Sequence, residues 1–211
     1  MTEGLDRLLA LLDLEHIDRN LYRGPNPAMT GGGGGRVFGG QVASQALMAA
    51  SKTVEPSELN RQTVHRVNSL HAYFLRPGRP GLPIIYSIDR IRDGSSFTTR
   101  RVVALQDGEA IFNLDASFHK EEPGGEFELP APLDGVPGPD EVARAEHGPG
   151  GGMHRRPIDT RELRDGPTPT STRAMWVRAD GELPDDPALH ACVLTYMSDS
   201  GPVGAARRPL L

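Results

Sequence analysis

The stretch IIYSIDRIRDGSSFTTRRVVALQDGEAIFNLDASFH, residues 84–119, limits the possible fold class most strongly. It contains three runs typical of β-strands, at residues 84–92, 95–106 and 109–119, and the last alternates apolar with polar side chains. Asp-Gly pairs at 93–94 and 107–108 separate these runs. Because Asp-Gly between strand patterns favours a type I′ turn, we predict two consecutive antiparallel hairpins.

Two segments before this stretch extend the pattern. Residues 63–75 (TVHRVNSLHAYFL) predict a further strand, and residues 39–52 (GGQVASQALMAASK) predict a helix. The helix is rich in Gly, Ala and Ser, so a sheet can approach its backbone closely. We therefore predict a buried helix followed by a four-stranded antiparallel meander that curls around it.

The N-terminal part adds an amphipathic helix and a loop. Leucines at helical spacing within residues 5–14 predict a helix that braces a neighbouring surface. Residues 20–38 are rich in Gly and Pro, and the five glycines at 31–35 predict a flexible loop. They do not form a G-x-G-x-x-G pattern, which disfavours phosphate binding.

The second half of the chain begins with 14 Gly or Pro among residues 123–152, a composition that predicts a linker or a long irregular connection. Short extended segments are predicted at residues 157–164 and 172–179. Residues 183–199 (LPDDPALHACVLTYMSD) predict a helix, with Asp185 or Asp186 as its N-cap and Pro187 at its first position.

These boundaries predict an α+β chain with a complete unit at residues 1–122, a linker at 123–152 and a partial second unit at 153–211. In the second unit no strand pattern follows Asp199. The apolar stripe of its helix is therefore expected either to stay unsatisfied or to be covered by the first unit or by another chain.

Composition excludes several classes of protein. The formal charge of −5 argues against a nucleic-acid groove, and the single cysteine, Cys192, excludes an internal disulfide framework. No apolar run approaches the length of a membrane span, and no secretory signal is visible. We therefore expect a cytoplasmic chain without a membrane span and without a nucleic-acid partner.

Few residues suggest catalysis or metal binding by themselves. His65 and His71 are six residues apart on one strand, hence expected on one face, and two partly buried, hydrogen-bonded histidines are favoured over a metal site. Cys192 lies in an apolar helical stripe and is expected to be a core thiol. Gly39, Gly40 and Gln41 open a helix whose amides could meet a carbonyl or phosphate, although a structural role is favoured.

Asp199 follows directly on the last turn of the 187–198 helix. The negative end of the helix dipole disfavours the ionised carboxylate and should raise its pKa. Such a carboxylate can serve as a general base for water. The alternative is an ordinary aspartate at a helix exit, where this residue also favours turns. Local sequence leaves both interpretations open.

Four long segments resemble the acyl-CoA thioesterase II (TesB-type) family. They are RVFGGQVASQALMAA (36–50), VHRVNSLHAYFLRPG (64–78), IDRIRDGSSFTTRRVVALQDGEAIFNLDASF (88–118) and LPDDPALHACVLTYMSD (183–199). The N-terminal segment DLEHIDRNLYRG (13–24) also matches. The resemblance implies a double hot-dog, in which each unit is a helix wrapped by an antiparallel sheet.

The resemblance also implies an activity, the hydrolysis of fatty acyl-CoA to free acid and CoA without a metal or redox cofactor. Asp199 matches the family's catalytic aspartate, which holds and deprotonates a water together with a Thr and a Gln further along the chain. We also expect a homo-oligomer.

The family's Thr and Gln lie downstream of the aspartate, whereas this chain ends 12 residues after Asp199. We therefore expect a C-terminally truncated product, with a complete first hot-dog and an incomplete second one. An acyl-CoA thioesterase is then one hypothesis for its function. The alternative is a non-catalytic hot-dog module that binds acyl-CoA or associates with another subunit.

Overall fold

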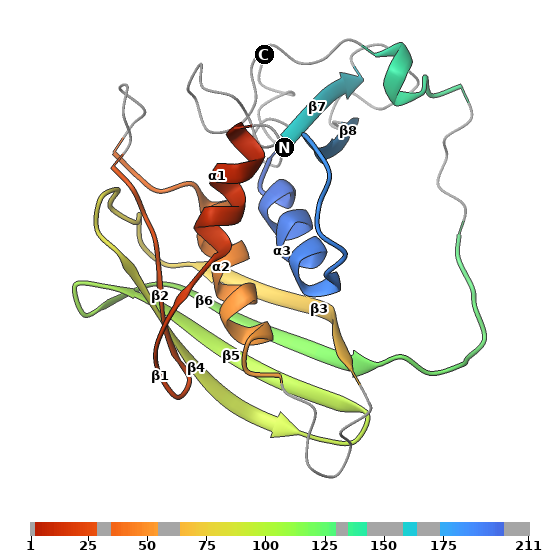
Figure 1. The fold of residues 1–211 in the computed structure, drawn as a ribbon. Helices are drawn as coiled ribbons and strands as arrows, with labels where there is room; N and C mark the ends of the chain where they lie inside the picture. The colour runs from red at the N-terminus through yellow and green to blue at the C-terminus, as the bar shows by residue number, and fades with distance from the viewer. Residues whose placement is uncertain are drawn as a thin grey trace.

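The computed structural model describes residues 3–28, 35–54, 64–129, 135–142, 158–163 and 174–200. Its helices are α1 (Glu3–Leu12), α2 (Gly39–Ser51), α3 (Pro187–Ser198) and the short 3-10 helix η1 (Pro139–Glu141). Its strands are β1 (Glu15–Asp18), β2 (Leu21–Gly24), β3 (His65–Phe74), β4 (Ile84–Asp93), β5 (Phe97–Gln106), β6 (Glu109–Lys120), β7 (Ile158–Leu163) and β8 (Ala174–Ala179). Figure 1 shows the larger sheet curving beneath the helices, as the sequence predicts.

The larger sheet has six antiparallel strands in the order β1-β2-β4-β5-β6-β3. The predicted meander is confirmed for β4, β5 and β6 but is wrong for β3, which pairs with β6 rather than with β4. Leu21–Gly24, for which the sequence predicts no strand, forms β2 and pairs with β4. Since β2 and β5 occupy both sides of β4, β3 cannot pair with β4, and it joins the sheet at β6.

The two predicted hairpin turns have different outcomes. Asp107 and Gly108 both have positive φ angles, of 52° and 80°, which confirms the type I′ turn between β5 and β6. At the other turn neither Asp93 nor Gly94 has a positive φ, so the type I′ prediction is wrong there. The last pair of that hairpin joins Asp93 to Thr98, which leaves four residues for the connection instead of two.

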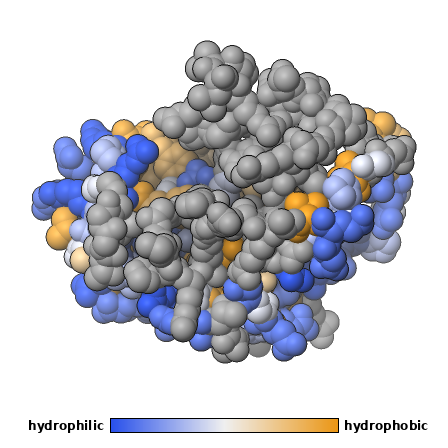
Figure 2. All heavy atoms as spheres, turned by 90° about the horizontal axis from the view of Figure 1, so that it is seen from above, coloured by the Kyte–Doolittle hydropathy of each residue, from blue (hydrophilic) through white to orange (hydrophobic). Residues whose placement is uncertain are grey.

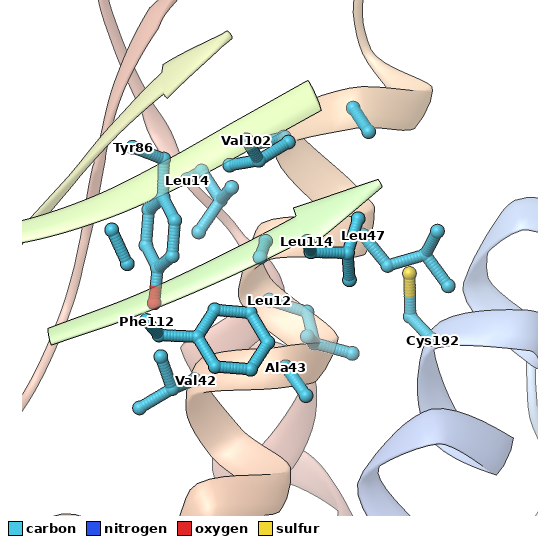
Figure 3. Packing of buried hydrophobic residues seen from close by; sticks show 14 of the residues in the cluster. Leu12, Leu14, Val42, Ala43, Leu47, Tyr86, Val102, Phe112, Leu114 and Cys192 are labelled. Atoms are coloured by element: carbon cyan, nitrogen blue, oxygen red, sulfur yellow. The ribbon is translucent and has the colours of Figure 1, made fainter. Parts of the chain in front are cut away.

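Helix α2 is buried against the sheet, as its small residues predict. Ala46, Ala49 and Ala50 are fully buried, and Leu47 reaches the side chains of the sheet (Figure 3). Gln45 is also buried, and its amide donates to the carbonyls of Leu11 and Pro25 at 2.7 and 2.9 Å. The hydroxyl of Tyr86 on β4 donates to the Gln45 carbonyl at 2.7 Å. These bonds fix α2 to both the N-terminal segment and the sheet.

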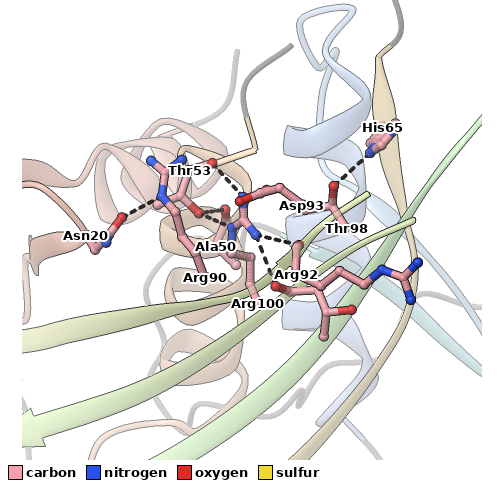
Figure 4. Close-up of polar contacts among 10 residues, drawn as sticks. Asn20, Ala50, Thr53, His65, Arg90, Arg92, Asp93, Thr98 and Arg100 are labelled. Carbon is pink, nitrogen blue, oxygen red and sulfur yellow. Dashed lines mark hydrogen bonds and ion pairs between the residues drawn. The ribbon is translucent and has the colours of Figure 1, made fainter. Parts of the chain in front are cut away.

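A buried arginine anchors the other end of α2. Arg100 on β5 donates from Nε to the Thr53 hydroxyl at 2.8 Å and from Nη2 to the Thr53 carbonyl at 3.0 Å. The same guanidinium donates to the carbonyls of Arg92 and Thr99 and pairs with Asp93 (Figure 4). Arg100 therefore joins the residues after α2 to the β4–β5 hairpin.

Helix α3 lies beside α2 on the same side of the sheet (Figure 1). Cys192 is buried in the same core as Leu47 (Figure 3), and Val193 also belongs to this core. Of the alternatives that the sequence left open for the apolar stripe of this helix, the structure shows cover by the first unit. Strands β7 and β8 form a separate two-stranded sheet near the predicted extended segments.

Three features of the sequence analysis lie wholly or partly outside the described residues. They are the glycines at 31–34, half of the predicted linker at 123–152 and the segment 201–211. Within the described part of the chain, no helix is both long and apolar enough to cross a bilayer. Figure 2, the view from above, shows hydrophilic residues on both flanks of the molecule, with small hydrophobic patches among the coloured residues.

Candidate active site

The candidate site begins at the end of α3. Asp186 caps the start of this helix, because its carboxylate accepts the amide N–H groups of Ala188 at 2.9 Å and Leu189 at 3.3 Å. Pro187 occupies the first turn, as predicted, and the helix ends at Ser198. Asp199 is the C-cap residue. The local sequence thus determines where this carboxylate lies along α3.

The start of α2 meets Asp199. The amide N–H of Gly40 donates to Oδ2 of Asp199 at 2.9 Å, across 159 residues of sequence. A Cβ on Gly39 would lie only 2.7 Å from the same oxygen, and a Cβ on Gly40 would collide with the backbone carbonyl oxygen of Tyr196. Glycine is therefore required at position 40 for α2 and α3 to approach this closely, whereas at position 39 a Cβ would displace the side chains of Asp199 and Phe74.

The surroundings of Asp199 favour its neutral form. Burial raises the pKa of the carboxyl above its ordinary value, and the hydrogen bond from Gly40 partly opposes this shift. The predicted direction is confirmed, but the main cause is burial rather than the helix dipole. A half-buried carboxylate with a raised pKa holds a proton more tightly and is a stronger base than one in water.

Three aromatic side chains lie near the carboxylate, around the start of α2 and the end of α3. Phe38, next to α2, packs its ring against Tyr196 of α3 with 5.0 Å between the ring centroids. Burial and the charge of Asp199 raise the pKa of Tyr196 to about 12, so this phenol stays neutral at physiological pH. Phe74, at the end of β3, contacts the same region of α2 through the edge of its ring. The arrangement places a half-buried base among aromatic side chains.

The two histidines of β3 are not brought together. A β-bulge between Val67 and Ser69 adds a residue to this strand, so His65 and His71 point to opposite faces of the sheet and the predicted common face is wrong. His65 is half-buried, and its Nδ1 lies 2.9 Å from the Thr98 hydroxyl (Figure 4). His71 is exposed and packs against a tyrosine, so the predicted partial burial holds only for His65.

Cys192 has the properties predicted for a core thiol. It is fully buried, and this burial raises the pKa of the thiol. A protonated, inaccessible thiol does not act as a nucleophile. Among the described residues, no three His, Cys, Asp or Glu side chains lie close enough to hold a metal ion. The described part of the chain therefore offers Asp199 as its candidate for catalysis.

Comparison with known proteins identifies the family. Residues 26–119 match the family model of the acyl-CoA thioesterase N-terminal domain, and residues 128–209 match that of the C-terminal domain. The chain is 35% identical to acyl-coenzyme A thioesterase 8 from mouse, over 95% of this chain and 67% of that protein. It is 32% identical to acyl-CoA thioesterase 2 from Haemophilus influenzae, over 94% of this chain and 71% of that protein. The chain belongs to the acyl-CoA thioesterase family.

Solved structures of thioesterases share this fold. The acyl-CoA thioesterase II TesB2 from Mycobacterium marinum is 36% identical, with a TM-score of 0.72 over 97% of this chain and 71% of that one. A TesB protein from Mycobacterium avium subspecies paratuberculosis is 29% identical, with a TM-score of 0.78 over 97% of this chain and 74% of that chain. The expected α+β hot-dog fold is therefore confirmed. This thioesterase chain spans about two thirds of the length of the mouse relative.

Proposed function

We propose that this chain hydrolyses acyl-CoA thioesters to a free acid and CoA, with Asp199 as the general base. The observation that carries the proposal is the hydrogen bond from the Gly40 amide to the half-buried Asp199 carboxylate. This contact holds a base of raised pKa at the start of a helix, among apolar side chains. Membership of the acyl-CoA thioesterase family supports the choice of substrate.

The proposed reaction uses water and no further reactant. Asp199 accepts a proton from a water molecule while the water oxygen attacks the thioester carbonyl carbon. The tetrahedral intermediate carries an oxyanion, which hydrogen-bond donors stabilise. The carbon–sulfur bond then breaks, and CoA leaves as a thiolate that takes up a proton. The carbonyl carbon keeps the oxygen of the water in the product acid.

The direct test is thiol release from dodecanoyl-CoA by the purified chain, followed with a thiol-reactive dye. We expect release above the rate in buffer that scales with protein concentration. Absence of release would contradict the proposed activity. In that case, retained binding of dodecanoyl-CoA in a calorimeter would support the alternative, a non-catalytic acyl-CoA-binding module.

The pH profile of turnover follows from the raised pKa of Asp199. A general base works only when deprotonated, so kcat should fall as the pH drops through the pKa of this carboxyl. Because that pKa lies above its ordinary value, the acidic limb should start at a higher pH than for an exposed aspartate. Rates measured from pH 4 to 9 should show this limb, and a rate that is flat to pH 4 would contradict the assignment.

We further propose that the chain acts in the cytoplasm as a homo-oligomer. Strand β3 is an edge strand of the six-stranded sheet, and its side chains Leu70 and Tyr73 are 39% and 59% exposed. An edge strand with exposed apolar side chains is typical of an association surface. Light scattering after size-exclusion chromatography should give a mass at least twice 22.8 kDa. A monomeric mass at all concentrations would contradict the proposal.

A further inference from the structure

One aromatic side chain beside Asp199 is open to solvent. Phe74, the last residue of β3, is 58% exposed, although its ring lies 5.0 Å from that of the buried Phe112. Its Cε1 lies 2.8 Å from the point that a Cβ on Gly39 would occupy, and Oδ2 of Asp199 lies 2.7 Å from the same point. Phe74 and the candidate base are therefore neighbours across Gly39.

The side of Asp199 toward Gly40 is closed. A Cβ on Gly40 would lie 2.5 Å from the ring of Phe38, which itself packs on Tyr196. Both of these aromatic residues are half-buried, whereas the ring of Phe74 is mostly exposed. Among the described residues around Asp199, Phe74 is thus the aromatic side chain that a ligand can reach.

We propose that Phe74 is a specificity-determining residue whose exposed ring contacts the acyl carbons next to the thioester carbonyl. This inference rests on the proposed function, because it assumes that the carbonyl is presented to a water held by Asp199. Contact between an exposed phenylalanine ring and methylene groups is favourable, because it removes apolar surface of both from water. The acyl chain supplies these, whereas the CoA portion is largely polar. Phe74 therefore favours long acyl chains over short ones.

The test compares two substrates and two matched variants. We expect Phe74→Ala to lower kcat/KM for dodecanoyl-CoA by about tenfold, because several methylene contacts are lost, and to change kcat/KM for acetyl-CoA by less than about twofold. The control is Phe97→Ala. Phe97 is a similarly exposed phenylalanine, at 45%, that stacks on His119 at the far end of the same sheet. This control should leave both substrates unchanged.

Each outcome decides the inference. Equal losses for both substrates would mean that the ring contacts the CoA portion, and unchanged rates would mean that it contacts neither, so both results overturn the proposal. If Phe74→Ala does not fold, Phe74→Leu keeps an apolar group on Phe112 and should show a smaller loss confined to dodecanoyl-CoA. If Phe74→Leu lowers kcat/KM for acetyl-CoA as much as for dodecanoyl-CoA, this variant also overturns the proposal.

The failure of the proposed function is distinguishable from that of this inference. If the unmodified chain releases no thiol, hydrolysis fails, and the dissociation constants of acetyl-CoA and dodecanoyl-CoA then test Phe74 directly. A preference of the unmodified chain for dodecanoyl-CoA that disappears in Phe74→Ala supports the inference. A preference that is absent, or that persists in the variant, overturns it.

Discussion

Asp199→Asn should lower kcat for dodecanoyl-CoA hydrolysis by about 10²- to 10⁴-fold, the range that a general base contributes. Asparagine keeps an oxygen that can accept the Gly40 N–H, so the contact between α2 and α3 survives. Its amide cannot take up a proton from water. The variant therefore separates the chemical role of the carboxylate from its structural role.

The matched control for this prediction is Asp115→Asn. Asp115 lies on β6, is half exposed and forms an ion pair with Arg101 at 3.0 Å. This control removes one carboxylate without touching the site, and kcat should stay within about twofold because exposed ion pairs contribute little. Thermal unfolding of both variants checks that each is folded. A kcat for Asp199→Asn equal to that of the control would exclude Asp199 as the base.

The second large effect is expected from Arg100→Met, which should lower the free energy of unfolding by about 3 kcal/mol or more. The Arg100 side chain is 1% exposed and holds the residues after α2 to the β4–β5 hairpin (Figure 4). Methionine fills a similar volume but donates no hydrogen bond. The buried hydroxyl and carbonyl of Thr53 would each lose a donor, and leaving buried acceptors unpaired is costly. The part-buried carbonyl contacts of Arg92 and Thr99 would be lost as well.

Arg101→Met provides the comparison in the same strand. The Arg101 side chain is 53% exposed, and its bond to Asp115 lies in solvent, so its loss should cost less than about 1 kcal/mol. Urea unfolding of the two variants measures the difference directly. Similar losses for Arg100→Met and Arg101→Met would show that the buried hydrogen bonds of Arg100 do not stabilise the fold.

Local patterns predicted the parts of the fold that depend on neighbouring residues. The Asp107-Gly108 turn forms because both residues tolerate positive φ angles. The start of α3 forms because Asp186 and Pro187 suit a helix N-terminus. The buried face of α2 follows from its small residues. Each of these features is determined within a few residues, so the sequence pattern alone contains the information.

Other features depend on distant partners and were mispredicted or missed. The place of β3 beside β6 depends on β2 and β5 already flanking β4. The bulge between Val67 and Ser69 depends on pairing with β6, and it separates the two histidines. Arg100 lies in a strand pattern that does not distinguish it from Arg101, because its burial depends on the residues that follow α2.

The candidate site shows the same division. The sequence alone identified Asp199 as a carboxylate at a helix end and Gly39 and Gly40 as the start of another helix. Only the packing of α2 against α3 brings the Gly40 amide to Asp199, across 159 residues, and buries the carboxyl enough to raise its pKa. Hydrophobic periodicity and helix capping depend only on residues within one or two helical turns of each other, so they contain no information about such distant contacts. Desolvation and helix–helix contact instead depend on segments that meet only in the folded chain.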